Sequence, residues 1–139
     1  MPDPASFSYI PPDATKRQSG GLPYLPITLR YRGRSITANA LLDTGATINV
    51  LPQKLGLQLG AVWEEQTPIA QLAGNLSTSE SRGVLITGLV SEYPAVRLVF
   101  AWTQNESAPL ILGQINFFQE FKACFDGSNQ MFTIHPKAQ

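Results

Sequence analysis

Residues 41–46 read Leu41-Leu42-Asp43-Thr44-Gly45-Ala46, an apolar run that ends in an aspartate on a Thr-Gly turn. A carboxylate at the end of a buried strand lies close to backbone N–H groups and is partly removed from water, so the fold controls its chemistry. Gly45 lets the chain turn sharply and lets another chain approach closely. Because Asp and Gly are common in turns, this stretch decides the fold only together with the sequence around it.

Two expected strands lead up to the aspartate. Apolar residues occupy every second position on both of them: Ile27, Leu29 and Tyr31 on the first, and Ile36, Ala38, Ala40 and Leu42 on the second. A period of two residues is typical of a strand with one buried face. Arg32-Gly33-Arg34 reads as the turn between them, and we interpret its arginines as part of a solvated face rather than as a basic patch.

Further short strands are expected downstream. Strand-like segments lie at 48–51, 57–63, 84–86, 96–102, 110–112 and in a hairpin over 124–134. Pro52 to Gly56 reads as one helical turn, and Phe117, Phe118 and Phe121 predict a helix over 114–121. Many short strands with one late helix favour a small closed or sandwich-like all-β fold.

Length and composition limit the function classes. With 139 residues the chain is expected to form one domain, and we interpret residues 1–21, rich in Pro, Ser, Asp and Gly, as a flexible N-terminal tail. The formal net charge is zero and 14% of residues are charged, which gives no electrostatic footprint for nucleic acid or a membrane. One cysteine, Cys124, and one histidine, His135, leave no metal-ligand cluster, so no metal or cofactor is expected. With no apparent secretory signal, we expect a cytoplasmic protein.

Two stretches together resemble a known signature. The hydrophobic pair before Asp-Thr-Gly-Ala, and the later Leu110-Ile111-Leu112-Gly113 before a short helix, are similar to the signature of the retropepsin-like aspartic proteases. The likeness runs from about Tyr24 to Ile134. It implies a small closed β-barrel of the acid-protease type over residues 22–139, with one short C-terminal helix. It also implies an aspartic endopeptidase that hydrolyses peptide bonds in peptide or protein substrates.

The resemblance assigns roles to named residues. It implies a catalytic role for Asp43, Thr44 and Gly45. It implies substrate contacts from Gly45 and Ala46 and from a flap whose residues are Gln71, Leu72, Ala73 and Gly74. The alternative for residues 67–76 is an ordinary surface hairpin. The sequence also departs from the retroviral pattern, because Thr47 and Gln114 stand where the viral enzymes carry an acidic residue and an arginine.

Aspartic proteolysis needs two neighbouring carboxylates, and this chain supplies one. Of the other aspartates, Asp3 and Asp13 lie in the expected tail, and Asp126 lies in a turn of the C-terminal hairpin, where we expect it to be exposed. The second carboxylate is therefore expected from a second copy, in a homodimer with Asp43 facing its symmetry mate. The alternative is a non-catalytic dimerising or peptide-binding module of the same fold. Glycoside hydrolysis is disfavoured because no glutamate pairs plausibly with Asp43.

Overall fold

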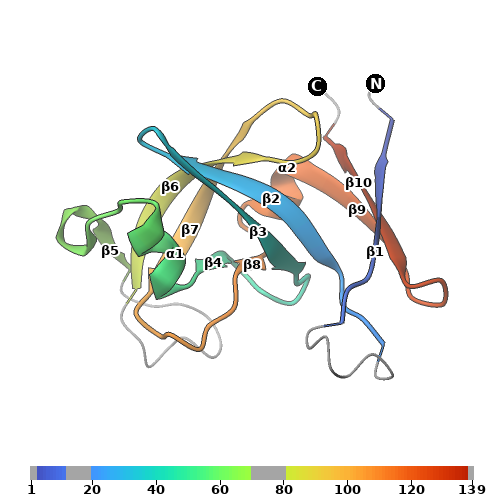
Figure 1. Ribbon diagram of the computed structural model, residues 1–139, viewed down its shortest axis with the longest axis horizontal. Coiled ribbons are helices and arrows are strands. Elements are labelled where there is room, and N and C mark those ends of the chain that lie inside the picture. Colours follow the sequence, from blue (N-terminus) through green and yellow to red (C-terminus); the bar gives the residue numbers. More distant parts are fainter. Residues whose placement is uncertain (1–2, 12–19, 70–80, 138–139) are drawn as a thin grey trace.

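The computed structural model describes residues 3–11, 20–69 and 81–137 (Figure 1). These ranges contain ten strands and three short helices, and none of the helices is long and apolar enough to cross a membrane. The strands are β1 (Ala5–Ser8), β2 (Tyr24–Tyr31), β3 (Arg34–Leu42), β4 (Asn49–Leu51), β5 (Thr67–Ile69), β6 (Ser81–Leu89), β7 (Val96–Thr103), β8 (Ile111–Leu112), β9 (Phe121–Asp126) and β10 (Met131–Pro136). The helices are α1 (Gln53–Gln58), the 3-10 helix η2 (Trp63–Glu65) and α2 (Phe117–Glu120).

The larger sheet closes on itself. Its strand order is β2-β3-β8-β4-β7-β6-β5, and β2 also pairs with β6, with Thr28 opposite Leu89. Most neighbours are antiparallel, but β3 runs parallel to β8 and β4 runs parallel to β7. Figure 1 shows these strands wrapping around a common interior. The predicted all-β fold with a closed ring of strands and a short C-terminal helix is confirmed.

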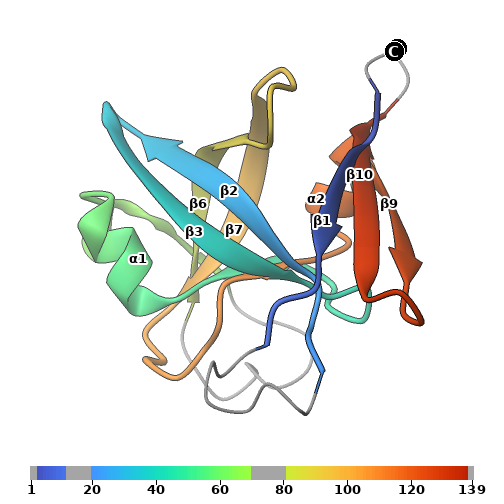
Figure 2. The same ribbon diagram turned by 45° about the vertical axis from the view of Figure 1, so that its right-hand side comes forward.

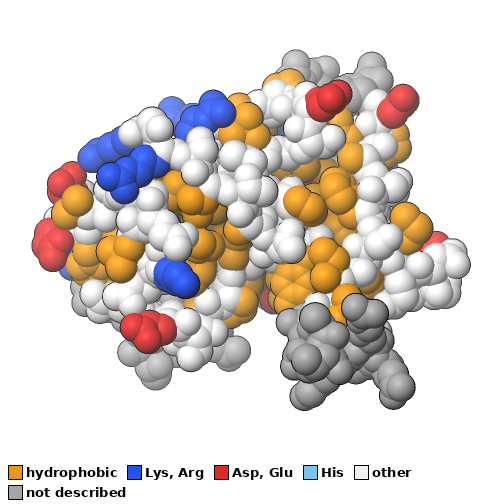
Figure 3. Space-filling model, in the orientation of Figure 1, with side chains coloured by type: hydrophobic (Ala, Val, Ile, Leu, Met, Phe, Trp, Pro, Cys, Tyr) orange, Lys and Arg blue, Asp and Glu red, His pale blue; other side chains and the backbone are white. Residues whose placement is uncertain are grey.

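The β2–β3 hairpin forms as its alternating sequence predicts. Leu25, Ile27 and Leu29 point inward and are at most 1% exposed. In the turn, Arg32 and Gly33 have φ angles of 46° and 85°. Two left-handed residues give a turn whose twist matches that of the strands it joins. The arginines lie in solvent, and Figure 3 shows Lys and Arg side chains gathered at the upper left, where Figure 1 places this turn.

A second, smaller sheet includes residues 5–8 of the segment expected to be a flexible tail over residues 1–21. Ala5–Ser8 form β1, which pairs with β10 in a three-stranded sheet of order β1-β10-β9. Figure 2 shows this sheet beside the barrel. Phe7 stacks on Phe132 with ring centroids 5.3 Å apart, and Tyr9 also lies against Phe132. The packing of Phe7 and Tyr9 on the buried Phe132 ring explains why a stretch poor in periodicity nevertheless forms a strand.

The C-terminal part follows the prediction with one difference. The β9–β10 hairpin is present, and Cys124 on β9 is exposed. The helix spans Phe117–Glu120 rather than 114–121, because Ile115 is engaged in a bridge with Ile48. The apolar face of the helix docks as expected, with the Phe117 and Phe121 rings stacked at 4.9 Å.

Residues 53–65 differ most from the sequence-based expectation. The alternating run from Leu57 to Trp63 predicts a strand, but Gln53–Gln58 form α1 and Trp63–Glu65 form η2. Gly56, expected to end a single turn, lies inside α1 and is buried. A Cβ at Gly56 would lie 2.2 Å from the Trp102 ring, so this glycine is what lets the helix pack on β7. Trp102 is 1% exposed and meets Trp63 edge to face, with ring centroids 5.1 Å apart.

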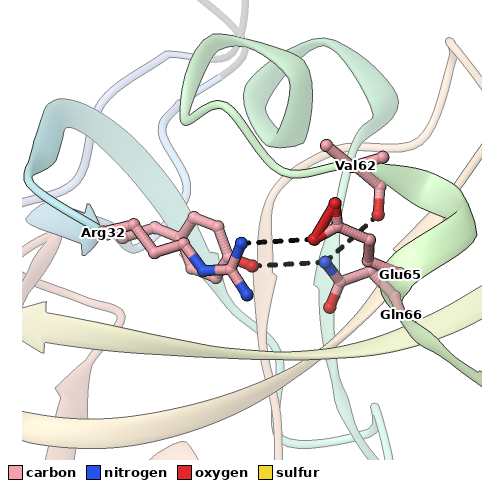
Figure 4. Close-up of polar contacts among 5 residues, drawn as sticks. Arg32, Val62, Glu65 and Gln66 are labelled. Carbon is pink, nitrogen blue, oxygen red and sulfur yellow. Dashed lines mark hydrogen bonds and ion pairs between the residues drawn. The ribbon is translucent and has the colours of Figure 1, made fainter.

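Polar contacts connect η2 to the β2–β3 turn (Figure 4). Arg32 Nη1 lies 3.3 Å from Glu65 Oε1. Gln66 Nε2 donates to the Tyr31 hydroxyl and to the Val62 carbonyl oxygen, each at 3.2 Å. The ion pair is exposed at both ends, so it adds at most about 1 kcal/mol. These contacts fix the segment that leads into β5.

The packing of Gly56 generates a test. In most helices Gly→Ala stabilises by about 0.5–1 kcal/mol. We predict the opposite here, because the new methyl group must displace the buried Trp102 ring. Gly56→Ala is expected to lower the free energy of unfolding in urea by about 1–3 kcal/mol. Gly127→Ala is the control, since no atom lies within 4 Å of the added Cβ, and its change should stay within about 0.5 kcal/mol. A stabilised Gly56→Ala variant would contradict the packing.

Candidate active site

Asp43 directly follows β3, the strand that the sequence places before it. β3 runs parallel to β8, with Leu41 opposite Ile111 and Leu42 opposite Leu112. The pairing continues into the turn, because Asp43 N donates to the Leu112 carbonyl oxygen at 3.0 Å. Leu42 and Leu112 are buried, whereas Asp43 is half-buried. The fold therefore delivers this carboxylate from the core to the surface at a fixed point.

The turn holds the carboxylate through its own backbone. Gly45 N donates to Asp43 Oδ1 at 3.0 Å, and Ala46 N donates to the Asp43 carbonyl oxygen at 3.1 Å. A Cβ on Gly45 would lie 3.4 Å from Asp43 Oδ1, about van der Waals contact distance from the carboxylate oxygen. Thr44 and Gly45 are exposed and Ala46 is half-buried. The loop thus presents one oriented carboxylate on an accessible face.

The second predicted segment, residues 110–113, lies against this loop. Gln114 N donates to Ala46 O and Ile115 N donates to Thr47 O, both at 2.9 Å. Gly113 makes the close approach possible, since a Cβ there would lie 2.8 Å from the carbonyl oxygens of Ala46 and Ile48. The structure therefore brings together the two sequence segments, about seventy residues apart, that carry the family resemblance.

A buried amide that the sequence analysis missed fixes this junction. Asn49 is 0% exposed, and its Oδ1 accepts from Gly113 N at 2.8 Å. Its Nδ2 donates to Val99 O at 2.9 Å and lies 3.3 Å from Asn116 Oδ1. Asn116 Oδ1 also accepts from Val99 N at 3.0 Å. One signal was available in the sequence, because an asparagine between Ile48 and Val50 must find buried partners if the strand is in the core.

From the sequence, Gln114 is notable only because it stands where the viral enzymes carry an arginine. In the structure it contacts the candidate site directly. Its Nε2 donates to the Thr44 carbonyl oxygen at 2.8 Å. Thr47, the other residue at which the retroviral charge is missing, is exposed and accepts the Ile115 bond through its backbone. A neutral amide therefore joins the loop to the β8–α2 connection.

Of the predicted substrate contacts, Gly45 and Ala46 lie in the Asp43 loop. The predicted flap residues Gln71, Leu72, Ala73 and Gly74 lie outside the described residues. The strands that lead toward and away from that segment are described, and they pair with Thr67 opposite Gly83 and Ile69 opposite Ser81. Within the described ranges, no group of three or more His, Cys, Asp or Glu side chains is placed to hold a metal ion.

Asp126, the other aspartate considered as an internal partner for Asp43, is engaged elsewhere. It ends β9 and is exposed, as expected. Its Oδ1 accepts from Ser128 Oγ at 2.9 Å and its Oδ2 accepts from Asn129 Nδ2 at 2.8 Å. Hydrogen bonds from the Asn129 side chain and then from Ser128 favour the ionised form and hold the pKa of Asp126 below its ordinary value. This carboxylate caps the turn of the β9–β10 hairpin.

Comparisons with known proteins identify the fold. No protein-family model and no curated protein matches the sequence. Among solved structures, the chain is similar to a retropepsin-like aspartic protease from Rickettsia conorii, with 9% identity over 98% of this chain and 95% of that one, and a TM-score of 0.64. It is also similar to the EIAV protease in complex with the inhibitor HBY-793, with 18% identity over 70% of this chain and 86% of that one, and a TM-score of 0.55.

The Asn49 network predicts a large loss of stability on substitution. Asn49→Leu keeps the side-chain size but leaves Gly113 N–H without its acceptor and Val99 O without its amide donor. We expect the free energy of unfolding in urea to fall by about 3 kcal/mol. Asn39→Leu is the matched control, because Asn39 is exposed on β3. Equal stability of the two variants would show that the buried amide does not support the junction.

The Asp126 contacts predict a titration difference. In the wild type, the pKa of the Asp126 carboxyl should lie below the ordinary value of 3.8, and Asn129→Ala should raise it toward that value. Since the folded pKa is lowered, the contacts stabilise the folded chain above the unfolded pKa and lose this effect as the pH falls through the folded pKa. The measurement is an NMR titration of the side-chain carboxyl carbon. An unchanged Asp126 pKa in the variant would refute the assignment.

Proposed function

The chain has the retropepsin-like fold, and from this premise we propose that it is an aspartic endopeptidase whose active site forms between two copies. The observation that carries the proposal is the placement of Asp43. It is an aspartate held at the end of β3 by Leu112 O and by its own turn, with Thr44 and Gly45 exposed beside it.

The need for a second copy follows from the count of carboxylates. The reaction requires two, and Asp43 is the single aspartate in the loop. Asp126 is occupied by its own hairpin turn, and Asp3 is exposed before β1. An isologous dimer brings Asp43 opposite its symmetry mate. Thr44 and Gly45 are exposed, and so is 47% of Ile115, the residue after Gln114. This face is therefore open to such a partner.

The chemistry assigned to the paired carboxylates is general acid–base catalysis. The ionised Asp43 of one copy takes a proton from a water molecule, and the oxygen of that water adds to the carbonyl carbon of the peptide bond. The protonated Asp43 of the second copy donates its proton to the carbonyl oxygen. Collapse of the tetrahedral intermediate then breaks the C–N bond as the leaving nitrogen receives a proton. No covalent enzyme intermediate is formed, and the roles of the two residues are interchangeable.

The substrate class follows from composition and from the loop. The chain has no net charge, and the exposed residues Thr44 and Gly45 carry a backbone N–H and a carbonyl oxygen, respectively, besides the two groups already bonded to Gln114 and Asp43. Extended peptides with largely apolar side chains fit such a site, because main-chain hydrogen bonds give affinity without requiring a charged residue.

The test is the activity of the Asp43→Asn variant on a mixed peptide library between about pH 3 and 7. Asn can neither take the proton from water nor donate one as an acid, so cleavage detected by mass spectrometry should fall at least about a thousandfold. Asp126→Asn is the matched control and should cleave like the wild type. Specific activity should rise with protein concentration, because the site is complete only in the dimer.

Two outcomes would contradict the proposal. Cleavage that survives Asp43→Asn would place the chemistry elsewhere. A stable wild-type dimer that cuts no peptide and does not bind a pepstatin-type inhibitor in an Asp43-dependent way would assign the fold to a dimerising or peptide-binding module. Such inhibitors imitate the tetrahedral intermediate and need the shared proton.

A further inference from the structure

Gln114 contacts the Asp43 loop twice. Its backbone N donates to Ala46 O at 2.9 Å, and its side-chain Nε2 donates to Thr44 O at 2.8 Å. The first bond continues the register between the loop and the residues after β8. The second is made by a side chain that is exposed and that comes from a different part of the sequence. Gln114 thus brackets the loop on both sides of Gly45.

The side-chain bond acts on the peptide unit next to the carboxylate. Thr44 C=O and Gly45 N–H belong to one planar trans peptide, so they point in opposite directions. When Thr44 O accepts from Gln114 Nε2, Gly45 N–H is directed to the other side, where it donates to Asp43 Oδ1 at 3.0 Å. Hydrogen bonds at the two ends of a peptide unit also polarise each other. A rotation of this peptide would break both bonds together.

We propose that Gln114 is a positioning residue for the Asp43 carboxylate, acting through the Thr44–Gly45 peptide. It does not reach the reacting atoms itself. Its effect is to keep Gly45 N–H on Asp43 Oδ1, which fixes the direction in which the other carboxylate oxygen faces. This inference deepens the proposed function and rests on it for the effect on catalysis. The bond to the loop is a property of the fold whether or not the chain cleaves peptides.

The neighbouring contacts explain why a side chain is required. Asp43 N is held by Leu112 O, and Ala46 O and Thr47 O are held by the backbone of residues 114 and 115. Gly45 N and Ala46 N donate within the loop, to Asp43. Among the described contacts, the Thr44–Gly45 peptide is joined to the rest of the chain only through Gln114 Nε2. Removing this donor therefore frees the peptide without disturbing the strands on either side.

The experiment uses two variants that differ in when they can donate a hydrogen bond. Gln114→Met has a similar size and cannot donate at any pH. Gln114→Glu can donate to Thr44 O while its carboxyl is protonated, and it loses the donor and faces the carbonyl oxygen with a negative charge once ionised. The control is Gln119→Glu, which adds the same charge at an exposed position of α2.

The first readout is kcat/KM on a cleaved peptide, as the ratio of each variant to the wild type from about pH 3.5 to 7. The ratio removes only the pH dependence that variant and wild type share, and Asp43 is the ionisable side chain on the facing loop. Gln114→Met should be lower by about two- to tenfold at every pH, mainly in kcat. Gln114→Glu should match the wild type at the acid end and fall by at least that factor as its carboxyl ionises. Gln119→Glu should stay near one throughout.

The second readout does not depend on activity. Amide hydrogen exchange of Gly45, measured by NMR at one pH, should be several-fold faster in Gln114→Met than in the wild type, while the amides of β2 and β7 keep their rates. If the wild type and all variants fail to cleave peptides but the Gly45 amide exchanges faster in Gln114→Met, the positioning role stands and the proposed function fails. If the wild type cleaves and both variants keep its kcat/KM and its Gly45 exchange rate, the positioning role is overturned. The positioning role would also be overturned if kcat/KM of Gln114→Glu fell by the same factor as that of Gln114→Met at every pH. Such a result would show that the loss comes from packing and not from the missing hydrogen-bond donor.

Discussion

The structure depends on the contact between the Asp43 turn and residues 110–115. Asp43 N, Gln114 N and Ile115 N each donate across it, at 3.0, 2.9 and 2.9 Å. Gly113 permits the approach, since any Cβ there would overlap the carbonyl oxygens of Ala46 and Ile48. This contact also matters for the topology, because β3 and β4 both pair with β8 beside it. The link between β3 and β4 in the ring of strands and the geometry of the carboxylate therefore depend on neighbouring hydrogen bonds.

Much of this arrangement is local and is visible in the sequence. Alternation on β2 and β3 predicts the hairpin, and Arg32-Gly33 predicts its turn. The motifs at Asp43 and Gly113 are visible in the sequence as glycine turns after apolar runs, but the contact between them is seen only in the structure. Strands β6 and β7 are also visible in the sequence, because their continuous or alternating apolar residues are typical of strands.

The parts that were missed depend on residues distant in the sequence. The run Leu57 to Trp63 alternates like a strand, but the space that Gly56 leaves for the Trp102 ring favours a helix there. β1 is stabilised by the packing of Phe7 on Phe132, and the sequence pattern of residues 1–21 does not predict that contact. The amides of Asn49 and Gln114 look like ordinary polar residues until their partners are known. Propensity describes neighbours along the chain, whereas these contacts are set by tertiary packing.

The pairing of β1 with β10 has a consequence for how the chain reaches this fold. Ala5 lies opposite Ile134, so the first strand finds its partner only in the last one. On the ribosome β1 must wait, with its edge unpaired and Phe7 without Phe132, until β10 has emerged. Bringing such distant segments together also carries a large loop-closure entropy, which slows folding. The barrel has its hairpins close in sequence, but the three-stranded sheet beside it can assemble only after synthesis of β10, and a nascent chain halted before that point would expose the edges that the finished sheet covers.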